Sequence, residues 1–262
     1  MIEMPRIARV KSRSGIYHVM LRGANRQEIF HDDEDCLTFL KIVEKYKIKS
    51  ELKIYAWCLM GNHIHLLMKE GNESLSITMK RIGVSFVSYY HWKYQTNGHL
   101  FQGRFRSENV EDVRYLLTVV SYIHQNPVKA GMVGKVDEWR WSSCPGYYGK
   151  HQVPKSLVDC QYILKFFSDD LTIAKEQFID FNERSLHVQC MDEQEIYKRR
   201  LSDEEARLMI KDVLGEIEIA QVKSLPKLQR NEVFREVKKI KGLSQRQAAR
   251  ILGVSASLIF KV

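Results

Sequence analysis

Residues 61–68 constrain this chain more than any other segment, because they combine an apolar pattern with two closely spaced histidines. The segment reads Gly-Asn-His-Ile-His-Leu-Leu-Met. Successive side chains of a β-strand point to opposite faces, so His63 and His65 share one face. Two neutral imidazoles buried side by side need a shared partner, which is usually a divalent cation. The pattern predicts a buried strand that carries a metal site, and an isolated His-x-His would also fit two hydrogen-bonded core histidines.

A second pattern lies in residues 122–126, which read Tyr-Ile-His-Gln-Asn. On a helix, Tyr122 and Asn126 share a face because they are four residues apart. A tyrosine beside a metal ion can attack a phosphodiester and form a covalent intermediate. Tyr115 is an alternative nucleophile, since it lies about two helical turns earlier on a similar face. We favour Tyr122, because it is the tyrosine that precedes the amide by four residues.

Charge is distributed unevenly along the 262 residues, which carry a formal net charge of +9. Lys and Arg outnumber Asp and Glu by 22 to 15 in residues 1–150 and by 10 to 2 in residues 220–262, whereas the acids prevail by 15 to 9 in between. Two basic segments around an acidic one indicate two nucleic-acid contacts. Five scattered cysteines without a Cys-x-x-Cys pair favour reduced thiols. The sequence contains no long apolar run and no signal-peptide pattern, so we expect a cytoplasmic protein.

The apolar periodicity of the first 150 residues predicts an α+β fold. The expected elements are strands at 16–22, 52–60 and 62–69, a short strand before 112, and helices from Asp32 or Asp33, from Ser74 to about 97–98, and from Asp112 to about Gln125. Because proline continues a helix poorly, Pro127 should leave Asn126 at or just past the last turn. This order predicts a small antiparallel sheet of the ferredoxin-like type, covered by helices on one face.

We divide the chain into a first domain at 1–150, an acidic helical connector at 151–220 and a basic unit at 221–262. Residues 243–255 of the last unit predict a helix, a turn at Gly253 and a second helix capped by Ser255, as in a helix-turn-helix. Gln245, Arg246 and Ser255 are its candidate DNA contacts, although the unit could instead serve dimerisation. The second helix has only about two turns before Val262, so we interpret the unit as a shortened helix-turn-helix.

These motifs resemble the REP-associated tyrosine transposases, a group of the HUH single-strand class with one catalytic tyrosine. The matching segments are 17–19, 22–27, 61–67, 101–106 and 122–133, and the resemblance covers about residues 5–150. It implies a 5′-phosphotyrosine intermediate on Tyr122, and single-stranded DNA with a palindromic hairpin as the partner. His63 and His65, with the side-chain oxygen of Asn126, would hold one Mg²⁺ or Mn²⁺.

Arginines in glycine-containing loops would clamp the phosphates of that strand, and the candidates are Arg22, Arg26, Arg104 and Arg106. Two other functions fit the fold. One is a DNA- or RNA-binding regulator that does not cleave, and the other is a rolling-circle replication initiator or relaxase. The intact His63, His65, Tyr122 and Asn126 favour the cleaving enzyme. We expect a nucleoid-associated monomer or homodimer with no membrane partner.

Overall fold

The computed structural model describes residues 10–151, 154, 156–184 and 201–262. Its strands are β1 (Ile16–Arg22), β2 (Lys53–Met60), β3 (His63–Lys69) and β4 (Arg106–Asn109). Its α-helices are α1 (Asp33–Lys49), α2 (Leu75–Tyr94), α3 (Val113–Lys129), α4 (Cys144–Tyr147), α5 (Cys160–Leu164), α6 (Leu171–Glu183), α7 (Asp203–Leu214), α8 (Lys227–Lys238), α9 (Gln245–Ile251) and α10 (Ala256–Phe260). Two 3₁₀ helices, η1 (Ala24–Arg26) and η2 (Ile219–Ser224), complete the described elements.

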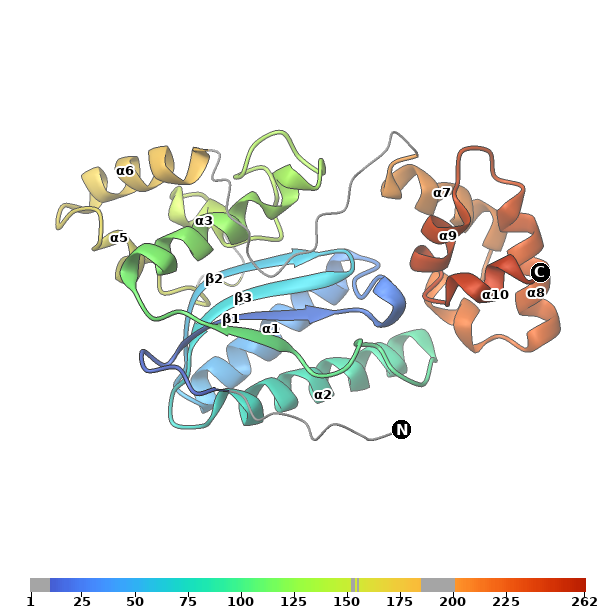
Figure 1. Cartoon of the computed structure of the whole chain (residues 1–262), viewed down its shortest axis with the longest axis horizontal. Helices are drawn as coiled ribbons and strands as arrows, with labels where there is room; N and C mark the ends of the chain where they lie inside the picture. Colours follow the sequence, from blue (N-terminus) through green and yellow to red (C-terminus); the bar gives the residue numbers. More distant parts are fainter. Residues whose placement is uncertain (1–9, 152–153, 155, 185–200) are drawn as a thin grey trace.

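The four strands form one antiparallel sheet in the order β2-β3-β1-β4 (Figure 1). This order, with α1 and α2 as the connections, is that of a ferredoxin-like α+β fold, and it confirms the predicted fold class. The central strands β3 and β1 pair over their full lengths, with Met20 opposite His65 and Arg22 opposite His63. The histidine strand therefore lies inside the sheet and is held from both sides.

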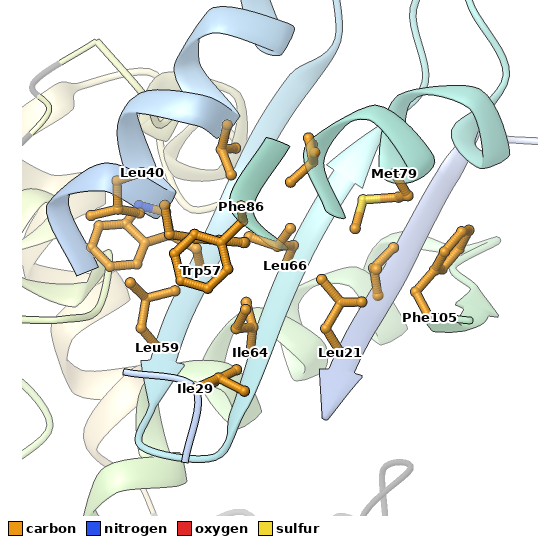
Figure 2. Packing of buried hydrophobic residues seen from close by; sticks show 14 of the residues in the cluster. Leu21, Ile29, Leu40, Trp57, Leu59, Ile64, Leu66, Met79, Phe86 and Phe105 are labelled. Carbon is orange, nitrogen blue, oxygen red and sulfur yellow. The ribbon is translucent and has the colours of Figure 1, made fainter. Parts of the chain in front are cut away.

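Helices α1 and α2 cover one face of the sheet and bury the first core (Figure 1). The side chain of Asp32 caps α1 by accepting a hydrogen bond from the backbone N–H of Asp35, as its position before an apolar helical pattern predicts. Figure 2 shows Leu40 and Phe86 from the helices facing Trp57, Ile64 and Leu66 from the strands. All five side chains are fully buried, so this face is closed to solvent.

The expectation that helices cover one face only is wrong, because α3, α5 and α6 pack on the opposite face (Figure 1). Strand β2 explains the difference. Its residues from Ile54 to Met60 are all buried, with alternate side chains such as Trp57 and Cys58 in different cores. A strand without polar alternation is buried on both faces, so the sheet needs a second layer of helices.

A third core joins α7, η2, α8, α9 and α10. Ala206, Ile210 and Leu214 repeat every four residues along α7 and face this core. The segment that we expected to be an acidic connector thus contributes α5 and α6 to the second core and α7 to the third. The exact domain boundaries at 150 and 220 stay a prediction.

Helix α3 differs from its predicted end, because it continues through Pro127 to Lys129. Proline removes one backbone donor, yet the last turn is closed by the N–H groups of Ala130 and Met132, which donate to the carbonyls of Asn126 and Pro127. The proline therefore costs the helix one backbone hydrogen bond, while the turn that follows it still forms. Helix α2, in contrast, ends earlier than predicted, at Tyr94. The next residue, Gln95, adopts a left-handed conformation with φ 48°.

The expected helix, glycine turn and second helix are present as α9, Gly253 and α10. Ser244 caps α9 by accepting a hydrogen bond from the N–H of Gln247, whereas Ser255 stands at the start of α10 without a side-chain cap bond. DNA binding by this pair of helices stays a prediction.

Cys36, Cys58, Cys144 and Cys160 are free thiols, and Cys190 lies outside the described residues. Among the described helices, none has the length and apolarity that a bilayer span requires.

Candidate active site and nucleic-acid interface

Strand β3 presents His63 and His65 on the face that α3 covers. Its intervening residues Ile64 and Leu66 point into the first core, which leaves the histidines on the opposite side. The two imidazole rings lie edge to face with their centroids 5.0 Å apart. The predicted pair of same-face histidines is therefore present.

Each histidine is oriented by a neighbour at its Nδ1 atom. The side-chain oxygen of Asn62 lies 2.7 Å from Nδ1 of His63, so this nitrogen donates and Nε2 is the basic one. Nδ1 of His65 lies 3.0 Å from Nε2 of His18 on β1. The Nε2 atoms of His63 and His65 are both buried. Fixing Nδ1 in this way is how proteins prepare the Nε2 atom of a histidine for a metal.

His18 was missed as a site residue by the sequence analysis. It is fully buried, stacks on His65 at a centroid distance of 5.2 Å, and has its Nδ1 atom 4.0 Å from a carboxylate oxygen of Glu108 on β4. The available signal was a histidine within an otherwise apolar strand, on the same face as Arg22. Its partner depends on the β1–β3 register, which local sequence does not reveal.

Burial lowers the pKa of His65 well below its usual value, and the charges that His63, His18 and Arg22 can carry lower it further. The His65 ring is therefore neutral at physiological pH. Neutral imidazole is the form that binds metal ions.

Helix α3 places Tyr122 against the histidines. Its ring is edge-on to His18 and His65, at centroid distances of 5.8 Å in each case. One turn later, the side-chain nitrogen of Asn126 donates to the carbonyl of Tyr122 at 3.0 Å, so the oxygen of that amide is the atom left for a ligand. Tyr115 is half-buried and packs against the second core.

The additional turn of α3 beyond Pro127 brings a cation to the tyrosine. Nζ of Lys129 lies 5.1 Å from the centroid of the Tyr122 ring. Because the predicted helix stopped near Gln125, Lys129 was also missed. An exposed ammonium beside the tyrosine can compensate phosphate charge.

Comparisons with known proteins find similarity for part of this chain. Residues 11–126 match the family model described as "Transposase IS200 like". The matched segment is less than half of the 262-residue chain. A REP-associated tyrosine transposase of Escherichia coli is 28% identical over 101 residues, which cover 38% of this chain and 58% of the relative. A Haemophilus influenzae protein assigned to the same kind of transposase is 31% identical over 100 residues, which cover 34% of this chain and 56% of the relative.

The chain thus spans little more than half the length of these two relatives. A solved structure of a REP-associated tyrosine transposase bound to a REP hairpin also matches, with a TM-score of 0.46 and 22% identity. That match covers 53% of this chain and 82% of the solved one.

Three of the four predicted arginines gather beside strand β4. Arg22, Arg104 and Arg106 line a small pocket of about 100 Å³ together with Met20, whose strand partner is His65. Arg26 lies elsewhere, in η1, where its carbonyl accepts a hydrogen bond of 3.4 Å from the side-chain nitrogen of Asn62 in the β2–β3 turn. The predicted clamp is therefore split between two places beside the histidines.

The candidate contacts of the C-terminal unit are also separated. Arg246 and Ser255 line a cleft of about 1360 Å³ that includes His63, whereas the half-buried Gln245 lies outside that lining.

The donor set of His63, His65 and Asn126 fits a weakly held Mg²⁺ or Mn²⁺. Among the described residues, no group of three or more His, Cys, Asp or Glu side chains is arranged to hold a metal. Two histidine nitrogens would therefore need the Asn126 oxygen as a third ligand. Such a neutral set leaves coordination positions for phosphate oxygens and water.

Proposed function

We propose that this chain is a metal-dependent endonuclease and strand transferase that acts on single-stranded DNA. The observation that carries the proposal is the position of the Tyr122 ring against the His18–His65 pair within an IS200-like transposase domain. Both relatives are named as REP-associated, which supports a strand from such an element as the substrate. The resemblance described above adds a palindromic hairpin.

In the proposed reaction, the hydroxyl oxygen of Tyr122 attacks the scissile phosphorus. The new bond is a 5′-phosphotyrosine, the bond from phosphorus to the 3′ oxygen breaks, and the phenol proton is lost while the 3′ oxygen gains one. The phosphodiester energy is conserved in the covalent bond, so attack by another 3′-hydroxyl rejoins DNA without ATP.

His63, His65 and Asn126 would hold the divalent ion, and His18 and Asn62 would orient the two imidazoles. A bound Mg²⁺ or Mn²⁺ supplies charge compensation at the phosphate as negative charge develops. Lys129 and the arginines Arg22, Arg104 and Arg106 would position phosphates on either side of the cleaved bond.

The test is to incubate the full chain with labelled hairpin strands from its own genome and Mg²⁺ or Mn²⁺, then separate covalent adducts on a denaturing gel. We expect an adduct with the native protein and with Tyr115→Phe, and none with Tyr122→Phe, although Tyr122→Phe still binds the strand. An adduct with Tyr122→Phe but not with Tyr115→Phe would assign the nucleophile to Tyr115.

The same assay tests the metal. His63→Ala or His65→Ala should reduce adduct formation by about 10²–10³-fold, because the charge that develops in the transition state is left uncompensated. EDTA should stop the native reaction. Full activity in excess EDTA contradicts the metal site, and strand binding without any adduct under all conditions favours the non-cleaving regulator.

A further inference from the structure

The cleft of about 1360 Å³ lies between the transposase domain and the helices of the third core. One wall consists of Arg26, Asn62 and His63 with residues 130–132, directly after α3. The other wall consists of Arg246 on α9, and of Ser255 and Ala256 at the start of α10. Small-molecule pockets are usually about 300–1,000 Å³, so this space suits a segment of a polymer.

Two side-chain contacts hold the C-terminal helices against the transposase domain, beside the cleft that His63 lines. Glu28 of the transposase domain is 3% exposed and forms an ion pair of 2.5 Å with Arg207 on α7. Burial raises the pKa of Glu28, and the Arg207 guanidinium opposes that rise. Nζ of Lys223 donates to the side-chain oxygen of Gln27 at 3.3 Å. These contacts make α7–α10 a fixed wall of the cleft.

The charges that line the cleft leave Arg246 available for an anion. Four of the five lining carboxylates form ion pairs, which are Glu28–Arg207, Asp32–Lys93, Asp33–Arg140 and Asp203–Arg250. Lys93 is shared with Glu34 and Asp35. The acid Glu204 remains at the exposed rim. Arg246 is exposed, and it forms no ion pair with any residue that the structure describes. A guanidinium in this position can bind a phosphate oxygen.

The same cleft offers apolar surface to bases. Half-buried Trp139 and exposed Met132 line it, as His63 does. Single-stranded DNA is bound where cations that contact the backbone alternate with side chains on which bases stack.

The docked arrangement does not suit duplex binding by α9 and α10. A helix-turn-helix inserts the N-terminal residues of its second helix into the major groove. Here Ser255 and Ala256 face the cleft, and Gly253 in the turn lies so close to Gln27 that an added Cβ would be 2.5 Å from its side-chain oxygen. The face that would enter a groove is turned towards the transposase domain.

From these observations we infer that the cleft binds the single-stranded DNA that flanks the cleaved phosphodiester, and that Arg246 holds a phosphate of this strand. The inference rests on the proposed function, which it deepens by placing the flanking strand. The C-terminal unit then completes the substrate site and does not act as a separate duplex-binding module.

The test measures binding in the Tyr122→Phe background without metal, so that cleavage does not intervene. The probes are a hairpin alone, the same hairpin with a 5′ or 3′ single-stranded extension of about ten nucleotides, and the extended hairpin with that extension made duplex. Arg246→Ala is compared with Arg235→Ala, which removes the same charge from an exposed position on α8 outside the cleft.

We expect Arg246→Ala to weaken binding of one single-stranded extension by about tenfold, and to lower the salt slope of log K by about 0.7, the value for one phosphate contact. Binding of the hairpin alone should stay unchanged, as should every measurement with Arg235→Ala. Equal behaviour of the two variants on all probes overturns the inference, and so does a loss confined to the duplex extension. A second outcome separates the two proposals. If binding of the extended hairpin depends on Arg246 but the native protein forms no adduct, the proposed function is contradicted and the strand site in the cleft is supported.

Discussion

Asn62 controls the ring of His63, because its side-chain oxygen accepts the Nδ1–H and leaves Nε2 for a ligand. Replacing such a partner typically lowers metal affinity about 10- to 100-fold. We therefore expect Asn62→Ala to weaken Mn²⁺ binding by that factor in calorimetric titration of the DNA-free protein. Asn62→Asp keeps an acceptor and should retain most of the affinity. Unchanged Mn²⁺ affinity in Asn62→Ala would show that His63 does not need this hydrogen bond.

Buried His124 makes the free energy of unfolding depend on pH. Burial lowers its pKa to about 3, against the hydrogen bond with Asn182, which raises it. The unfolded chain binds a proton near the usual pKa of about 6.5, so between these values the unfolded state holds more protons. Native stability is therefore complete above about pH 6.5 and falls as the pH decreases towards 3, by up to about 1.4 kcal/mol per pH unit for this one group.

Urea unfolding of His124→Gln at pH 7, 6 and 5 measures this contribution. We expect a shallower loss of unfolding free energy than in the native protein over the same range. His151→Gln, which alters an exposed histidine, should keep the native dependence. Parallel curves for the native protein and His124→Gln would mean that other groups cause the acid sensitivity.

At the scale of elements, the ion pair between α7 and the segment before α1 holds the two parts of the molecule together. Removing one partner of a buried pair leaves an uncompensated charge and costs about 3–5 kcal/mol. Arg207→Ala should therefore release the C-terminal helices and leave the sheet domain folded. Limited proteolysis should then produce a stable fragment that contains residues 11–126, whereas Lys211→Ala, an exposed change on the same helix, should not. If Arg207→Ala resists proteolysis like the native chain, Glu28–Arg207 does not secure the docking.

The packing of helix α7 determines which C-terminal deletion leaves a well-folded protein. Its apolar face packs with Phe234 and Val237 of α8 in the third core. Deletion of residues 221–262 would expose that face, whereas deletion of residues 201–262 removes the core as a whole. We expect the longer deletion to give the better-behaved protein in size-exclusion chromatography, with metal-dependent nicking of short hairpins retained. A well-behaved shorter deletion would contradict the packing of α7 with α8.

For the whole molecule, the sequence predicts what depends on local pattern. Apolar runs locate β1 and β3 within a residue or two, and helical spacing with a capping aspartate locates α1. The same patterns place His63, His65 and Tyr122 on the elements where the structure has them. His18 and Lys129 were not predicted. The contact of His18 with His65 depends on the β1–β3 register, and the position of Lys129 depends on the continuation of α3 through Pro127. The second helical layer was missed, although the unbroken apolar run of β2 was a signal of burial on both faces. The cleft depends on contacts between residues about 200 positions apart, for which the sequence carries no local signal.

The close approach of Gly253 to Gln27 constrains how the two parts of the chain can evolve. At Gly253 (φ +66°) any side chain is strained, and a Cβ would collide with Gln27. Gln27 in turn donates to the carbonyl of Leu100 at 2.8 Å, so it has little freedom to withdraw. Transplanting the C-terminal helices onto a different sheet domain would thus require the matching surface around Gln27 and Glu28. We expect evolution to exchange the two parts together or not at all.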